Sequence, residues 1–461
     1  MIPNKTNRRI VIAVSSLAVA LIFLGAIALL VNLSWFDAPL HPELESLKEV
    51  HPVSLEHNAY PIALGFLAAD DRDPRAAGEQ ILQSLHDRFL RRERVTLNSS
   101  EMETILGSAN PEQWQAGFKG LDCNPRVDLD CADRLIAEVA LANSQDARLA
   151  VLLRRYETML RQEHLVESQE RDAYTPVAPY HAILDVGRIR LAMSYRRDST
   201  SDVLAKAADD FRFWTITLRE GETLVDKMIS VAGIQNTLDF LSALMRDRQL
   251  TGTDIQFIQN FLRPMTAEEA DIGEAFLSEA RIALLSETPP VAMDSSWFIR
   301  WTLQRNATLN ELYLNTIVPM RLRSALTPEQ FYRQGAYRPL NNDAREFPFS
   351  LFNLGGWIAS RDATWDPEQF VARVHDEDGR ISLVLLQTEM EQMPDSDVNA
   401  VLSSSRWRNP YTGDPMAYDS ESHTIGFECL HTAFHPPASP DKCRITIDSD
   451  LNFRTLAEPK S

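Results

Sequence analysis

The sequence lacks the short motifs that mark most nucleotide-binding and hydrolytic sites. It contains no G-x-G-x-x-G fingerprint and no G-x-x-x-x-G-K-[ST] loop, so no phosphate cradle can be argued from it. A G-x-S-x-G nucleophile elbow and an H-E-x-x-H zinc helix are also missing. The sequence therefore offers no signature of a dinucleotide enzyme, a P-loop NTPase, an α/β-hydrolase or a zincin, and we predict no cofactor.

Basic residues are scarce relative to acidic ones. The chain has 46 lysines and arginines against 65 aspartates and glutamates, which gives a formal net charge of −19. Because an acidic body repels phosphate backbones, we expect no nucleic-acid partner. The 44% of hydrophobic residues is instead typical of a folded globular body.

Acidic residues gather in short runs at positions 70–73, 268–271 and 376–379. None of these runs continues into a twelve-residue calcium loop with a closing glutamate. Acidic residues near helix starts complement the helix dipole, so we expect these runs to be solvated helix faces and not metal sites.

One long apolar run stands near the N-terminus, at residues 10–31, and contains no charge and no proline. As a helix it would be about 33 Å long, enough to cross a hydrocarbon core of about 30 Å. Basic residues precede the run and acidic residues follow it, so the positive-inside bias leaves residues 1–9 in the cytoplasm.

A cleaved signal peptide is the alternative interpretation of this run. The run is longer than a usual signal-peptide core, and no small-x-small cleavage site follows it. We therefore predict an uncleaved transmembrane anchor at residues 10–33, with the lipid bilayer as its partner, followed by a linker at residues 34–57.

The region 58–324 has a helical pattern almost throughout. Apolar residues at 3.6-residue spacing predict two helices separated near Asn143, a helical hairpin within 200–245, and further helices over 252–262 and 266–285. No repeat signature recurs, so a non-repeating bundle or irregular helical array is expected. The predicted fold class is mainly α.

The remainder, residues 325–461, begins as an aromatic and proline-rich connection. A helix is predicted over 367–393, although the run 376–379 could instead be a hairpin turn before a strand. Alternation in HTIGFEC predicts a strand that pairs with CRITID as a small C-terminal β-hairpin. Trp407, Tyr411 and Tyr418 are expected to cover the hydrophobic face of this sheet, and the alternative is that they form an exposed binding surface.

The four cysteines fall into two local pairs, Cys123 with Cys131 and Cys429 with Cys443. An even count with short spacings in an exported chain predicts two disulfides. The alternative for the second pair is a zinc site made of Cys429, His431, His435 and Cys443.

Two further groups are candidates for chemistry. His375 stands beside Asp376 and Asp378 as a potential base with its orienting acid, but an exposed histidine at a helix interruption is the commoner outcome. Asp209, Asp210 and Lys227 are placed to meet across the helical hairpin, where a structural ion pair is expected in preference to an acid/base dyad.

Several segments in the same order resemble a family of uncharacterised membrane-anchored helical proteins of Gram-negative bacteria. They are NAYPIALGFLAADDRDPRAAG, the first cysteine pair before LLRRYETML, DDFRFWTITLREGETLVDKMISVA, FNLGGWIA with FVARVHDEDGRISLVLLQTEM, and NPYTGDPMAY. The resemblance covers most of the region after the anchor and brings no assigned activity. It implies an inner-membrane location with the body in the periplasm.

These observations favour a membrane-tethered periplasmic scaffold or interaction protein without catalysis, with an envelope protein as partner. The first alternative is a periplasmic enzyme of hydrolase type built from His375, Asp376, His431 and His435. The second is a module that binds a peptide or small ligand near the membrane.

Overall fold

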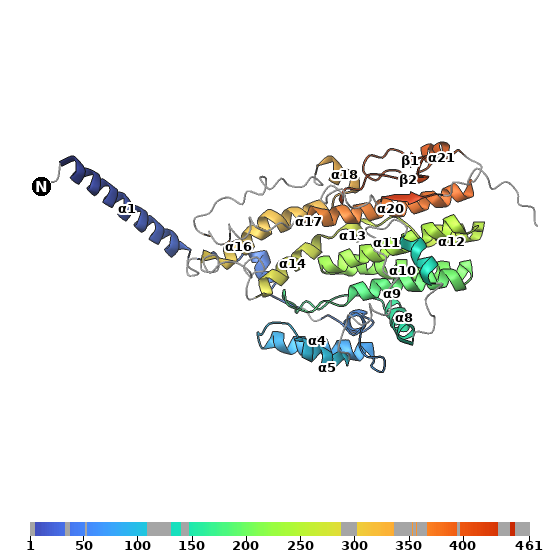
Figure 1. Cartoon of the computed structure of the whole chain (residues 1–461), viewed down its shortest axis with the longest axis horizontal. Coiled ribbons are helices and arrows are strands. Elements are labelled where there is room, and N and C mark those ends of the chain that lie inside the picture. Colours follow the sequence, from blue (N-terminus) through green and yellow to red (C-terminus); the bar gives the residue numbers. More distant parts are fainter. Residues whose placement is uncertain are drawn as a thin grey trace, which may run out of the picture. The chain divides into compact units, whose positions relative to one another are not determined.

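The computed structural model describes residues 5–32, 37–50, 53–107, 131–139, 147–286, 302–335, 353, 356, 367–393, 397–431 and 443–447. Within these residues the protein is mainly helical, as the sequence predicts, with one small antiparallel sheet near the C-terminus (Figure 1). The chain divides into two compact units. Unit 1 comprises residues 1–49, 280–319 and 340–365, and unit 2 comprises residues 50–279, 320–339 and 366–461.

The helices in the first half are α1 (Lys5–Val31), α2 (Pro42–Ser46), α3 (Tyr60–Leu64), α4 (Pro74–Leu90), α5 (Ser99–Leu106), α7 (Cys131–Val139), α8 (Ala147–Leu160), α9 (Tyr180–Arg197) and α10 (Thr200–Glu220). Those in the second half are α11 (Leu224–Asp247), α12 (Gly252–Phe261), α13 (Ala267–Ala270), α14 (Gly273–Leu285), α16 (Arg305–Leu312), the π-helix η3 (Tyr313–Ile317), α17 (Val318–Ser324), α18 (Pro328–Arg333), α20 (Glu368–Gln392) and α21 (Val398–Ser404). The strands are β1 (Ala417–Asp419), β2 (Thr424–Gly426) and β3 (Arg444–Thr446).

In unit 1, the segment after α1 is hydrogen-bonded to the beginning of α16. The Asp37 carboxylate accepts hydrogen bonds from the backbone N–H groups of Asn306, at 2.8 Å, and Ala307, at 3.0 Å. It thereby satisfies two N–H groups that a first helical turn leaves without partners. The Gln304 side chain donates to the carbonyl of Val31 at 2.7 Å, at the last residue of α1. The described part of the predicted linker 34–57 therefore has contacts with α16, and it also contains α2.

The core of unit 2 is built around the predicted helical hairpin, α10 with α11. Thr223 and Asp226 form a capping box that begins α11 directly after α10 ends. The helices approach closely because Gly233 has no Cβ: one built there would lie 2.3 Å from the Trp214 ring. Trp214 is only 1% exposed. Helix α11 also packs against α9 and α20.

The predicted helix over 266–285 is in fact two helices, α13 and α14. Asp271 leaves helical geometry with ψ 112°, and its side chain accepts a hydrogen bond from the backbone N–H of Gly273 at 2.8 Å. Such a local bond from an aspartate to a backbone N–H two residues later competes with helix continuation. The break separates the helices at this point.

Helix α20 runs without interruption through residues 376–379, so the alternative of a turn followed by a strand is wrong. Gly379 lies inside this helix at a point of close packing. A Cβ there would lie 2.3 Å from the Phe427 ring. The absence of a side chain at Gly379 therefore allows α20 to pack closely against Phe427, and the helix continues past this residue.

The sheet has the order β1-β2-β3, with both pairs antiparallel. The predicted pairing of the two strands around the Cys429–Cys443 loop is confirmed, with Ile425 opposite Ile445. A β-hairpin alone was nevertheless the wrong prediction, because Ala417–Asp419 adds a third strand, with Tyr418 opposite Ile425. This strand is only three residues long, too short to produce a periodic sequence signal.

Candidate functional site

Three consecutive acidic residues of α20 each have a polar partner within unit 2. Asp376 binds the loop that follows β2. Glu377 binds Arg380, which also pairs with Asp239 of α11. Asp378 accepts a hydrogen bond from the backbone N–H of Met265 at 2.7 Å. This run was expected to be a solvated helix face, and that prediction was wrong: Asp376 and Glu377 are each 3% exposed.

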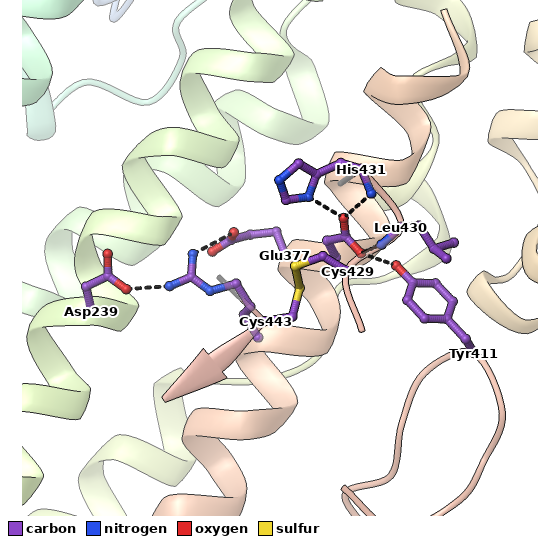
Figure 2. Close-up of a disulfide and its surroundings, with 9 residues drawn as sticks. Asp239, Glu377, Tyr411, Cys429, Leu430, His431 and Cys443 are labelled. Carbon is purple, nitrogen blue, oxygen red and sulfur yellow. Dashed lines mark hydrogen bonds and ion pairs between the residues drawn. A yellow bond between two sulfur atoms is a disulfide. The ribbon is translucent and has the colours of Figure 1, made fainter. Parts of the chain in front are cut away.

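Asp376 accepts four hydrogen bonds from three residues (Figure 2). Its Oδ1 accepts from the Tyr411 hydroxyl at 2.5 Å and the Leu430 backbone N–H at 2.8 Å. Its Oδ2 accepts from the His431 backbone N–H at 2.9 Å and lies 2.6 Å from His431 Nδ1. Both oxygens of this buried carboxylate therefore have hydrogen-bond donors.

The same contacts orient the His431 ring. Because a carboxylate oxygen accepts hydrogen bonds, Nδ1 is the donor in this contact, and Nε2 lies on the other side of the ring. The ring edge opposite Nδ1 points away from the carboxylate (Figure 2), and the side chain is 21% exposed. An orienting acid with a partly exposed imidazole is an arrangement that can accept a proton.

A disulfide stands beside this cluster. The sulfur atoms of Cys429 and Cys443 lie 2.06 Å apart and the Cα atoms 5.4 Å apart, which confirms the predicted pairing. Phe427 donates its backbone N–H to the Cys443 carbonyl at 2.9 Å, so the ladder between β2 and β3 continues to the disulfide. Cys131 is also disulfide-bonded, and its predicted partner Cys123 lies outside the described residues.

Burial dominates the electrostatics around α20. It raises the pKa of the Tyr411 hydroxyl well above its ordinary value, and the negative charge of Asp376 raises it further. Burial also raises the pKa of Asp378 to about 6, against the opposing hydrogen bond from Met265. For Arg380, burial lowers the pKa, but the charges of Glu377 and Asp239 outweigh it and the pKa is raised.

His375 is not the exposed histidine that the sequence suggested. It is 0% exposed and packs edge-on against Phe331, with ring centroids 5.2 Å apart. Among the described residues neither of its ring nitrogens has a hydrogen-bond partner, and burial lowers its pKa to about 4. His375 and Asp376 are thus not a base and its orienter; the histidine bonded to Asp376 is His431, 55 positions later.

The three aromatic residues proposed as a binding surface do not share one role. Tyr411 is 2% exposed and its ring contacts Phe427 at a centroid distance of 5.8 Å, so it belongs to the sheet's buried face. Trp407 and Tyr418 are half-buried. The Arg406 guanidinium lies over the Trp407 ring at 4.4 Å. An exposed surface that includes Tyr411 is therefore excluded.

The predicted zinc set does not hold a metal in the disulfide form, because the sulfur atoms of Cys429 and Cys443 are bonded to each other. His435 lies outside the described residues. The donor that sequence reasoning did not include in this set is Asp376. Asp376, Cys429 and His431 offer ligand-type atoms that all lie within 4.8 Å of one another.

The candidates in the helical hairpin are separated. Asp210 pairs with Arg190 at 2.6 Å and accepts a hydrogen bond from Tyr156. Lys227 donates to the backbone carbonyls of Leu218 and Arg219 at the end of α10. The ion pair expected among Asp209, Asp210 and Lys227 is therefore not formed by Asp210 and Lys227, because each of these two has another partner.

The other two acidic runs also have structural roles. Asp73 accepts a hydrogen bond from the backbone N–H of Ala76 as the N-cap of α4. Glu269 completes the capping box of α13 and binds Arg263 through both carboxylate oxygens at 2.7 Å. Both residues complement a helix start, as predicted, but Glu269 is only 2% exposed, so the prediction of a solvated face was wrong at this position.

No family model, curated protein or solved structure matches the chain. The resemblance to membrane-anchored helical proteins of Gram-negative bacteria therefore stays a prediction.

Proposed function

We propose that the protein is a scaffold or interaction protein of the bacterial cell envelope, held in the inner membrane by α1. In this proposal residues 1–9 are cytoplasmic, the anchor spans residues 10–33, and the rest of the chain is in the periplasm with an envelope protein as its partner. The proposal does not include catalysis.

The observation that carries the proposal is the exposure of apolar side chains around α1. Leu17, Leu21, Ile22 and Phe23 are 60 to 72% exposed. Positions 21, 22 and 23 point in three directions separated by about 100° each, so the apolar surface surrounds the helix. A helix that is apolar on all sides is suited to lipid and not to an interface where one face meets water.

By length and hydropathy, one described helix qualifies as a membrane span, and it is α11. In that helix 67% of the most apolar window is buried. Asp226 is fully buried within it and Arg380 of α20 pairs with its Asp239, so α11 serves as a core helix of unit 2. Between the two, α1 is the better candidate for the anchor, with the apolar stretch Ala13–Ile27 at its centre.

The contacts of Asp37 and Gln304 support a tether that is joined to folded protein. Asp37 binds the first turn of α16, and Gln304 binds the last residue of α1. These contacts limit rotation at the end of the anchor, which suits a protein that presents a surface at a fixed place near the membrane.

The experiment for the anchor is alkaline carbonate extraction of membranes that contain the full chain. Each arginine near the centre of a spanning helix costs about 2.5 to 3.5 kcal/mol of insertion free energy. The double substitution Leu17→Arg and Leu21→Arg should move the protein to the soluble fraction, whereas Leu17→Ala with Leu21→Ala should remain in the membrane. Extraction of the wild-type chain by carbonate would refute the anchor.

The experiment for the scaffold role is crosslinking in intact cells followed by purification of the full chain. A defined envelope protein should be captured by the wild type and by the alanine pair, and lost from the arginine pair. If the same proteins are captured in all three cases, or none is captured, the tethered-scaffold proposal fails.

A second candidate function is a hydrolase-type enzyme, and the observation that favours it is the contact between Asp376 and His431. If His431 is a general base, a hydrolytic activity toward ester, phosphoester or peptide substrates should be abolished in His431→Gln while the fold is retained. An activity that survives in that variant would remove His431 from the reaction.

A further inference from the structure

We propose that reduction of the Cys429–Cys443 disulfide converts the cluster on α20 into a zinc site whose ligands are Cys429, Cys443, His431 and Asp376. The inference is independent of the scaffold role, and it differs from the sequence-predicted zinc set in one ligand, because Asp376 takes the place of His435.

The donor atoms of the proposed site lie close together in the structure. The two sulfur atoms are adjacent through their bond, and the Cys429 sulfur, a His431 nitrogen and an Asp376 oxygen lie within 4.8 Å of one another. Two thiolates, an imidazole and a carboxylate are ligand types that tetrahedral zinc accepts at about 2.0 to 2.3 Å. Three of these donors already lie together, and Cys443, which is bonded to Cys429, has to turn toward them once that bond is reduced.

Hydrogen bonds hold the two non-sulfur donors, Asp376 and His431, in place. Tyr411 and the Leu430 backbone hold Oδ1 of Asp376, which leaves Oδ2 directed at Nδ1 of His431 at 2.6 Å. Hydrogen bonds of this kind orient a ligating carboxylate and tune the affinity of a metal site. Tyr411 would keep its bond to Oδ1 while Oδ2 binds the ion.

Three of the four proposed ligands are buried. Asp376 is 3% exposed, Cys429 2% and Cys443 0%. Reduction alone would leave two buried thiols beside a buried carboxylate. A dication offsets two of the three negative charges that two thiolates and the carboxylate carry, and the Tyr411 hydroxyl and the Leu430 and His431 backbone N–H groups donate hydrogen bonds to the carboxylate.

The reaction balances with a dithiol as the reductant. The dithiol gives two electrons and two protons to the Cys429–Cys443 bond and becomes a disulfide, and two protein thiols are formed. Zinc then displaces the two thiol protons to solvent. His431 takes the tautomer with hydrogen on Nε2, so that the Nδ1 lone pair binds the ion.

The test uses the detergent-solubilised full chain with zinc chloride as the probe. One sample stays oxidised, and the other is reduced with a dithiol and freed of reductant without oxygen. Bound zinc is measured with a chromophoric indicator and thiols by alkylation mass spectrometry. We expect one additional zinc per chain in the reduced wild type relative to the oxidised protein.

The control is Cys429→Ser with Cys443→Ser, which keeps the pair at Cys123 and Cys131 and reports any zinc bound there. Tyr411→Phe should weaken zinc binding about tenfold through its effect on Asp376. Asp376→Asn should weaken it more, and circular dichroism checks that each variant is folded. If the serine pair fails to fold, the two other variants carry the comparison.

Three results would overturn the proposal. In the first, the folded protein keeps its Cys429–Cys443 bond in excess dithiol. In the second, reduced wild type binds no more zinc than the serine pair. In the third, zinc binds equally well when Asp376 is replaced. None of these results bears on the membrane anchor, which is tested separately.

Discussion

Asp376 should be the residue on which attachment of the C-terminal sheet to α20 depends most. Replacing it with alanine leaves four donors without their acceptor: the Tyr411 hydroxyl, two backbone N–H groups and His431 Nδ1. Because Leu430 is buried and His431 half-buried, water does not freely replace the lost carboxylate.

The magnitude follows from the number and type of these bonds. A hydrogen bond to a charged group contributes about 1.5 to 3 kcal/mol, but the four share one carboxylate and are not additive. Removing the carboxylate also removes the cost of burying it. Breaking a buried charged cluster by deleting one partner costs about 3 to 5 kcal/mol, and we expect Asp376→Ala to lie in this range.

The assay is hydrogen exchange of the full chain, read by mass spectrometry in the peptide that covers residues 424–431. A loss of at least 3 kcal/mol in the free energy of local opening accelerates exchange about 100-fold or more. Peptides from α10 and α11 provide the internal reference and should change little. Tyr411→Phe removes one of the four bonds and should accelerate exchange about tenfold.

The reasoning is refuted if Asp376→Ala accelerates exchange less than tenfold in this peptide. It is also refuted if the acceleration is equal in α10 and α11, since the residue would then act on global stability and not on sheet attachment.

Three further predictions concern α20. Gly379→Ala should destabilise the protein by about 1 to 3 kcal/mol because its Cβ meets the Phe427 ring, whereas Gly252→Ala, with open space around its Cβ, should not; denaturant midpoints compare them. Burial lowers the pKa of His375 from 6.5 to about 4, so between these pH values the unfolded chain binds more protons than the folded one, and stability falls as the pH drops. His375→Leu should remove up to about 3 kcal/mol of this loss, measured as the free energy of unfolding at pH 7 and at pH 4.5. The pKa of Asp378 is raised from 3.8 to about 6, so this residue contributes in the opposite direction and lowers stability as the pH rises from 3.8 to 6. Asp378→Asn should remove this loss of stability at the higher pH. An unchanged dependence of stability on pH would contradict burial as the cause of the shift.

Local patterns predicted the helices well because their determinants are local. The Thr223–Asp226 capping box and the apolar stripes of 200–245 specify α10 and α11 within a few turns of chain. The pairing of β2 with β3 was equally accessible, since alternation and a nearby cysteine pair mark both strands.

The site itself was not predictable in this way. An acidic run with a glycine is typical of a solvated turn, whereas in the structure the hydrogen bonds of Asp376 and the contact between Gly379 and Phe427 show that this part of α20 is covered. The choice of His431 over His375 as partner of Asp376 depends on a contact across 55 positions, for which periodicity carries no information.

The distance along the chain between Asp376 and its partners has a consequence for how the protein matures. Tyr411 lies 35 positions later, and Leu430 and His431 lie 54 and 55 positions later. Residue 376 is therefore synthesised, and in an exported chain translocated, well before the groups that satisfy its charge exist. Contacts of such separation form after the local helical ones, because a longer loop must close first. A chain that stops short of residue 430 would lack three of the four hydrogen bonds to the Asp376 carboxylate, a state that quality-control proteases can recognise as unfinished.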